Sequence, residues 1–222
     1  MQSFPKMIDR YEIVEELGAG GMGSVYKARD LESNRTVAIK LIRSAGLSSA
    51  GAKSRFHREM DISSRFQHPN IVSVYDIGVS EEMPYMVMEY IKGPPLLKYI
   101  EEKKISLRDR LIILEKVALA LEYAHRQKII HRDMKPSNIM IAESGEPVLM
   151  DFGLAKSTEI SDLSLTRSGE ILGTPQYMAP EQAKGSRREI DERTDTYGLG
   201  AIFYHLLTGF PPAQGETLLS IV

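Results

Sequence analysis

The chain contains no cysteine among its 222 residues. This absence excludes disulfide bridges, zinc sites with thiolate ligands and thiol catalysis, and it fits a reducing compartment. An excess of charge of one sign is also lacking, because 28 basic and 30 acidic side chains leave a net charge of -2. Such a balanced chain offers no electrostatic footprint for nucleic acid or an anionic membrane as its main partner.

Long apolar runs are missing as well. The longest mostly apolar stretch, residues 197–207, is too short to span a bilayer, and we interpret it as a buried core helix. The first residues lack the apolar segment of a signal peptide. We therefore expect no membrane segment in this chain and a cytoplasmic location, for the domain alone or within a longer parent protein tethered to a membrane.

Two patterns of secondary structure divide the chain near residue 93. Before that point, apolar runs between glycine, serine, asparagine and proline predict strands at residues 11–17, 24–30, 36–42, 71–79 and 84–90. After it, Ser106 with Asp109 forms a helix-capping signature. The apolar positions at helical spacing are Leu107, Leu111, Leu114, Val117, Ala118 and Leu121. The chain thus predicts an α+β fold with a β-rich domain at 1–92, containing one main helix, and a mainly helical domain at 93–222.

A glycine cluster, LGAGGMG, places Gly18, Gly20 and Gly23 in a G-x-G-x-x-G pattern. Glycines at this spacing also build ordinary tight hairpins. A dinucleotide-binding fold requires a helix directly after the glycines, whereas SVYKA predicts a strand. A P-loop requires Gly-Lys-Ser/Thr, which is absent. A glycine-rich hairpin between antiparallel strands can instead fold over phosphates, because its backbone N–H groups approach the oxygens without obstruction from a Cβ atom.

One lysine, Lys40, interrupts the apolar strand TVAIKLI. In isolation it fits either a side chain that extends from a sheet edge into solvent or a buried functional cation. Glu59 lies on the same helical stripe as Phe56, Met60 and Ser63, which should face the core. An acid there requires a cation, and Lys40 is the nearest buried candidate.

Five motifs follow one another in the order of the protein-kinase signature set. They are the glycine pattern with Val25, VAIK ending in Lys40, HRDMKPSN at 131–138, DFG at 151–153 and APE at 179–181. The chain thereby resembles the protein kinase superfamily, and GAGGMGSVYKARD and GTPQYMAPEQA resemble eukaryotic-like serine/threonine kinases of bacteria. The resemblance implies a two-lobed kinase fold, an activation segment at 151–181, and transfer of the ATP γ-phosphate to serine or threonine hydroxyls of protein substrates. It also implies ATP with Mg²⁺ or Mn²⁺, and a homodimer for autophosphorylation.

The polar residues of HRDMKPSN have expected roles in phosphoryl transfer. Phosphoryl transfer to a hydroxyl needs positioning, charge neutralisation and an acceptor for the proton, and Asp133 is the expected acceptor. The resemblance makes Lys135 a γ-phosphate contact. Asn138 and Asp151 offer the hard oxygen ligands that Mg²⁺ prefers. A hairpin that turns at Ser144–Gly145 should bring these two ligands to one metal site.

The resemblance also implies an adenine pocket, because apolar walls with a few directed polar groups suit a nucleotide base. Its expected members are Leu17, Val25 and Ala38 on one face of the base, Met140 on the other, Met88 as the gatekeeper, and the backbone of Glu89 and Ile91. Each apolar member also fits plain core packing.

Hydroxyl side chains are frequent between Asp151 and Glu181. A phosphate there can pair with the guanidinium of Arg132. By resemblance, Thr166 and Ser168 are the expected phosphorylation sites, and Thr174 is expected at the acceptor site.

Kinases of this family continue for several dozen residues, which include helices of the larger lobe and an arginine that pairs with the glutamate matching Glu181. Without them, the helical lobe would be incomplete and would expose apolar surface around residues 201–210. Two functions therefore stay open: an active kinase, or a nucleotide-binding scaffold or inactive truncated fragment. Retention of the whole catalytic set favours the first; the set is Lys40, Glu59, Asp133, Asn138 and Asp151. His125 and His131 are interpreted as structural.

Overall fold

The computed structural model describes residues 5–20, 23–42, 66–81, 83–152, 175–186 and 189–213. The described residues divide into two compact units. The first comprises the described residues up to Gln67 and those within 72–91, and the second comprises His68–Ile71 and the described residues from Lys92 onward. The main helix predicted around Glu59 lies outside the described residues.

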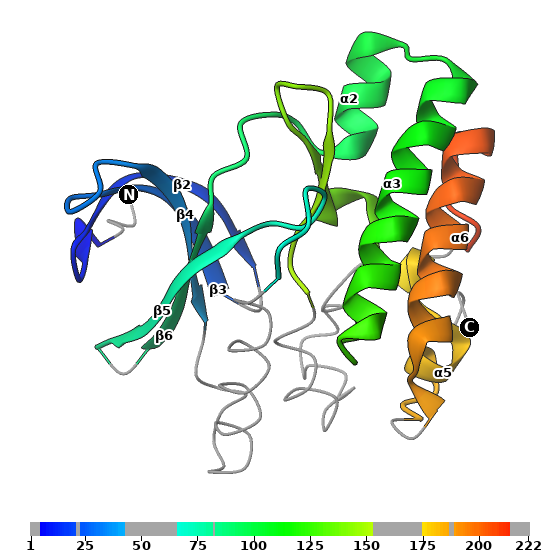
Figure 1. Ribbon diagram of the computed structural model, residues 1–222. Coiled ribbons are helices and arrows are strands. Elements are labelled where there is room, and N and C mark those ends of the chain that lie inside the picture. Colours follow the sequence, from blue (N-terminus) through cyan, green and yellow to red (C-terminus); the bar gives the residue numbers. More distant parts are fainter. Residues whose placement is uncertain are drawn as a thin grey trace. The chain divides into compact units, whose positions relative to one another are not determined.

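The first unit contains a six-stranded antiparallel sheet in the order β1-β2-β3-β4-β6-β5 (Figure 1). Its strands are β1 (Met7–Ile8), β2 (Tyr11–Gly20), β3 (Gly23–Asp30), β4 (Thr36–Ile42), β5 (Val74–Ser80) and β6 (Met83–Glu89). The five longer strands are those that the sequence predicted, and β4 has the predicted bounds. β1 is too short to give a periodic signal and was not predicted.

One face of this sheet forms the core of the unit. Tyr26 pairs with Ile39 and Ile39 pairs with Val87, so the three side chains project from the same face. The other buried members of the cluster are Ile8, Tyr11, Ile13, Ala28, Val37, Leu41 and Tyr85. The Tyr11 hydroxyl on β2 donates to Asp76 Oδ2 on β5 at 2.8 Å. Because these strands are far apart in the sheet order, the bond shows that the sheet is curled.

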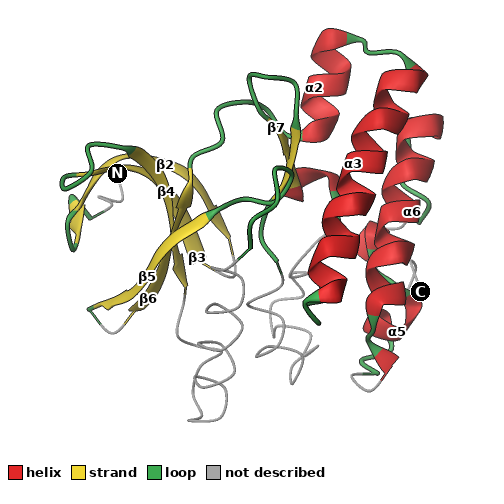
Figure 2. Ribbon diagram, in the orientation of Figure 1, coloured by secondary structure: helices red, strands yellow, loops and turns green. Residues whose placement is uncertain are grey.

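The second unit is mainly helical. Its described helices are α2 (Leu96–Lys103), α3 (Leu107–Arg126), α5 (Pro180–Ala183) and α6 (Glu192–Thr208), with 3₁₀ turns η2 (Pro136–Asn138) and η3 (Pro175–Tyr177). The strands β7 (Ile139–Ile141) and β8 (Pro147–Leu149) form the predicted hairpin, in which Gly145 adopts φ +85°. Figure 2 shows α3 and α6 running side by side.

Helix α3 begins as the sequence predicted, because the Ser106 hydroxyl accepts a hydrogen bond from the Asp109 N–H at 3.2 Å. Its buried residues are Ile113, Leu114, Val117, Ala120, Leu121 and Ala124. Three of the apolar positions at helical spacing, Leu107, Leu111 and Ala118, are exposed. The helix carries apolar residues around more than one face, and its contacts with β8 and α6 select the buried one.

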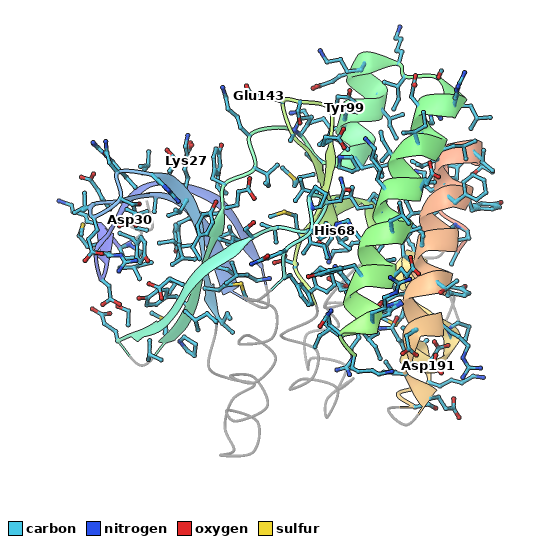
Figure 3. The ribbon with its side chains drawn as sticks, in the orientation of Figure 1. Lys27, Asp30, His68, Tyr99, Glu143 and Asp191 are labelled. Atoms are coloured by element: carbon cyan, nitrogen blue, oxygen red, sulfur yellow. The ribbon has the colours of Figure 1, made fainter. Side chains whose placement is uncertain are left out.

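Asp191 is the N-cap of helix α6, and its side chain accepts from the Arg193 N–H at 2.9 Å (Figure 3). The interpretation of residues 197–207 as a buried core helix was only partly right, since one face of α6 is buried and the other is exposed. Gly198 lies on the buried face, where an added Cβ would stand 2.5 Å from the Cβ of Met134. The exposed apolar side chains on α6 and just beyond it are Tyr197, Phe203, Tyr204, Leu207 and Phe210. Among the described residues, no helix combines the length and hydropathy needed to cross a bilayer.

Candidate active site

The backbone of the HRDMKPSN loop is held by a buried carboxylate from α6. Asp195 is completely buried, and its two oxygens accept hydrogen bonds from the N–H groups of His131 at 2.7 Å and Arg132 at 2.8 Å. His125 Nε2 lies 2.7 Å from Asp195 Oδ2. These hydrogen bonds to one buried carboxylate fix the start of the loop from helix α6.

His131 connects the loop to the strand end that precedes Asp151. Its Nδ1 accepts from the Asp133 N–H at 3.2 Å, so Nε2 must carry the proton that it donates to the Met150 carbonyl at 2.8 Å. Burial lowers the pKa of this imidazole, which keeps it neutral. The ring also packs against Phe152, with 4.8 Å between ring centroids. These contacts use both ring nitrogens, which makes His131 a structural residue of the loop.

Three of the predicted catalytic side chains form one polar cluster. Lys135 Nζ lies 2.8 Å from Asp133 Oδ2, and Asn138 Nδ2 lies 3.0 Å from the same oxygen. Asn138 Nδ2 also donates to the Asp133 carbonyl at 2.7 Å. The Asp133 side chain retains 15% exposure and that of Lys135 retains 20%. The carboxylate is therefore held by two donors yet remains accessible, as a proton acceptor must be.

The two predicted metal ligands are brought to the same end of the β7–β8 hairpin. Ile139 pairs with Leu149, and the Met150 N–H donates to the Asn138 carbonyl at 2.8 Å. Asp151 follows at once, with φ +52°, a left-handed conformation that non-glycine residues adopt uncommonly.

The donor set fits a divalent cation. Because Asn138 Nδ2 is engaged with Asp133, the Oδ1 atom of Asn138 is the side-chain atom left for a ligand. The described residues contain no group of three or more His, Asp or Glu that could hold a metal ion on its own. Mg²⁺ is commonly bound through one or two protein oxygens with water and substrate phosphates, so two protein ligands are sufficient.

In the first unit, four predicted nucleotide contacts share one face of the sheet. Val25 pairs with Lys40 and Ala38 pairs with Met88, and directly paired residues project from the same face. Alternation along β4 puts Ala38 and Lys40 together. This face is opposite the buried cluster that contains Ile39, so the register separates the predicted binding residues from the core.

The glycine hairpin and the strand end at Glu89 complete the predicted set in this unit. Gly23 has φ +142°, and an added Cβ would lie 1.8 Å from the Leu41 carbonyl oxygen, so only glycine fits there. Gly18 and Gly20 have no atom within 4 Å of an added Cβ. Leu17 is 45% exposed. The Glu89 N–H donates to the Ser73 carbonyl at 2.9 Å and is therefore engaged within this unit.

The remaining predicted residues are distributed as follows. Ile91 is buried in the first unit, and Met140 lies half-buried on β7 in the second. Glu59, Thr166, Ser168 and Thr174 lie outside the described residues.

The APE motif is tied to α6 in a way that the sequence did not indicate. The Thr194 hydroxyl donates to Glu181 Oε1 at 2.5 Å. The Tyr177 hydroxyl lies 2.5 Å from His205 Nδ1, and the two rings are stacked at 9°. Gln182 Nε2 donates to the Arg132 carbonyl at 2.7 Å. Described residues 175–186 are thus fastened both to α6 and to the candidate catalytic loop.

Two of these anchoring residues, Asp195 and Gln182, were missed by sequence reasoning. Asp195 had one detectable signal, since an acid near the start of an otherwise apolar helix needs partners if it is buried. Gln182 had none, because a glutamine in the first turn of a short helix is ordinary.

A loop carboxylate bonded to a lysine and an asparagine, with a second carboxylate at the end of the adjacent hairpin, defines a candidate phosphotransferase site. Residues 11–221 match the model of the family described as protein kinase domain, and the chain belongs to this family. The family resemblance inferred from the five motifs is therefore confirmed. Protein kinases as a family use ATP with a divalent metal.

Bacterial serine/threonine kinases are among the relatives. The chain is 40% identical over 218 residues to serine/threonine-protein kinase PknB of Mycobacterium tuberculosis (strain ATCC 25618 / H37Rv). It is 39% identical over 213 residues to serine/threonine-protein kinase PrkC of Bacillus subtilis (strain 168). Both matches cover 96% of this chain, which spans only 34% and 32% of these relatives.

A solved structure supports the fold. The crystal structure of the Mycobacterium tuberculosis PknI kinase domain matches with a TM-score of 0.73 and 29% sequence identity. The match covers 92% of this chain and 75% of that one. The predicted fold class, a kinase-like combination of a β-rich and a helical part, is confirmed.

Proposed function

We propose that this chain is an ATP-dependent serine/threonine protein kinase that transfers the γ-phosphate of ATP to hydroxyls of protein substrates. The observation that carries the proposal is the cluster in which the Asp133 carboxylate is bonded to Lys135 and Asn138. Membership of the protein kinase family and the names of the bacterial relatives support the same reaction.

The candidate residues would divide the reaction between them. Asp133 accepts the proton of the substrate hydroxyl as the oxygen attacks phosphorus. Lys135 donates to the transferring phosphoryl group, whose negative charge it stabilises. Lys40, from the first unit, donates to phosphate oxygens of the nucleotide and balances Glu59. The negative carboxylate of Asp133 suits a proton acceptor, and the positive charges of Lys135 and Lys40 suit the negative phosphate groups.

Asn138 and Asp151 would hold Mg²⁺, with Mn²⁺ as a substitute, through their side-chain oxygens. The cation supplies neutralisation of the phosphate charge. The hydrogen bonds of the Asn138 amide nitrogen to Asp133 and the left-handed backbone at Asp151 would orient the two ligand atoms.

The adenine base would lie against the sheet face that carries Val25, Ala38 and Met88, with Leu17 and Met140 as further apolar contacts. The carbonyl of Glu89 and the backbone of Ile91 would form hydrogen bonds with the edge of the base. The glycine hairpin would cover the phosphates through its N–H groups.

Regulation would act through phosphates on Thr166 or Ser168. Arg132 Nε is the buried side-chain polar atom that has no hydrogen-bond partner among the described residues, which favours an anion at this guanidinium. Thr174 would contact the acceptor hydroxyl. Autophosphorylation would occur between two copies of the chain in the cytoplasm, where ATP is available.

A nucleotide-binding scaffold without transferase activity is the second candidate. The exposed apolar side chains of α6, such as Tyr204 and Leu207, favour association with other surfaces. Incubation with γ-labelled ATP, Mg²⁺ and a basic protein substrate separates the two functions. Label recovered as phosphoserine or phosphothreonine supports the kinase, whereas saturable ATP binding without any transfer supports the scaffold.

A further inference from the structure

The side chain of Gln182 links the short helix α5 to the candidate catalytic loop. Its Nε2 donates to the carbonyl of Arg132 at 2.7 Å, and its Oε1 accepts from the N–H of Ala179 at 3.2 Å. Glutamine offers both a donor and an acceptor at the end of one side chain. Both are used here, one on each of two segments that are 50 residues apart.

The carbonyl that Gln182 binds belongs to the peptide unit immediately before Asp133. A peptide unit is planar, so fixing the Arg132 carbonyl also fixes the direction of the Asp133 N–H. That N–H donates to His131 Nδ1 at 3.2 Å. Gln182 therefore sets the orientation of the backbone from which the Asp133 carboxylate projects.

The backbone at Arg132 needs such support. Its φ of +64° lies in the left-handed region, which non-glycine residues adopt uncommonly. The Arg132 N–H is held by Asp195 at 2.8 Å, and its carbonyl is held by Gln182. The two side chains thus clamp this residue from both sides, one from α6 and one from α5.

We propose that Gln182 is a positioning residue for Asp133. Its side chain couples helix α5, which begins within the APE motif, to the loop that carries the proton acceptor. The inference rests on the proposed kinase function and adds a residue to it. Gln182 acts through the Arg132 carbonyl, so its loss should lower turnover without weakening nucleotide binding.

Two variants separate positioning from simple helix capping. Gln182→Glu keeps an oxygen for the Ala179 N–H, and a glutamate at this helix position is a good cap. It cannot donate to the Arg132 carbonyl and sets a negative charge against it. Gln182→Met loses both bonds at similar volume. We expect kcat to fall on the order of ten- to hundredfold in both variants, with KM for ATP and the thermal midpoint of Gln182→Glu near those of the unmodified chain.

Amide hydrogen exchange of the peptide covering residues 131–138 gives a readout that does not require phosphoryl transfer. Exchange should be faster in both variants than in the unmodified chain. If the unmodified chain transfers no phosphate but exchange still rises in both variants, the kinase proposal fails and the anchoring by Gln182 stands. If the unmodified chain is active and Gln182→Glu retains its kcat or its slow exchange, the positioning role is overturned.

Discussion

The carboxylate of Asp195 lies 2.7 Å from the backbone nitrogen of His131, although 64 residues separate the two in the chain. The same carboxylate holds the next N–H, that of Arg132, at 2.8 Å. The conformation of the candidate catalytic loop is therefore determined by a helix that follows it much later in the sequence. Asp195 lies in the first turn of α6, and Asp191 is the N-cap of the same helix. The two acids therefore form a matched pair for testing this anchoring.

Asp195→Asn should lower both stability and turnover. The new amide NH₂ faces backbone donors where the carboxylate oxygen accepted, so the loss in the free energy of unfolding should be about 2–3 kcal/mol. Asp191→Asn is the control, because asparagine is an equally good N-cap and this variant should stay near the unmodified chain. Urea denaturation and initial rates measure both effects. Equal stability and activity of the two variants would show that the buried carboxylate is dispensable.

Lys40→Met should reduce turnover on the order of 10² to 10³, because it removes the cation assigned to the nucleotide phosphates. Lys27→Met is its control. Lys27 projects from the same sheet face, where it pairs with Ala38, but its Nζ is engaged by Glu15 at 2.9 Å (Figure 3). Circular dichroism should show both variants folded. A Lys40→Met chain that transfers phosphate at the normal rate would exclude the assigned role.

Replacing Thr166 and Ser168 together by alanine should lower activity and leave ATP affinity unchanged. Each phosphate carries roughly -1.5 to -2 charge at neutral pH and would pair with the Arg132 guanidinium. Arg132→Ala should give the same defect and should not add to that of the double variant. Mass spectrometry of active protein checks the modification directly. Active protein that carries phosphate at neither site contradicts this regulation.

Stability should fall as the pH drops below about 6.5. Burial lowers the pKa of His131, and also those of His68 and His205, below the value of a histidine in the unfolded chain, about 6.5. Between that value and the lower folded pKa, the unfolded chain binds protons that the folded chain does not. Each histidine then removes at most about 1.4 kcal/mol per pH unit from the free energy of unfolding.

Urea denaturation between pH 7.5 and 5 measures this loss, and NMR titration of the His131 imidazole isolates its contribution. A titration midpoint of His131 at or above 6.5 would contradict the buried, neutral imidazole.

Much of the fold could be predicted because its signals are local. The Ser106 cap, the turn at Gly145 and the strand β4 each depend on residues close together in the chain. The buried face of α3 could not be predicted, since Leu107 and Leu111 fit the helical period as well as Ile113 does. Only the elements that pack against α3 decide between them, and the same holds for the exposed face of α6.

The residues of the candidate site also differ in whether local sequence could predict them. Asp133, Lys135 and Asn138 lie within one short motif, and the structure brings them together. Asp195 and Gln182 reach the loop from more than 45 residues away. Nothing in their immediate sequence identifies the backbone groups that they bind. Their roles follow from the hydrogen bonds alone.

Phosphoryl transfer and ATP binding measured on the same preparations of the unmodified chain and Asp133→Asn test the kinase proposal most directly. Asparagine keeps the size of the side chain but cannot accept the proton, so turnover should fall on the order of 10² to 10⁴ while ATP affinity stays nearly unchanged. The expected result is label on serine or threonine from the unmodified chain and almost none from Asp133→Asn. Equal transfer by the two, or no transfer by the unmodified chain despite bound ATP and Mg²⁺, would contradict it.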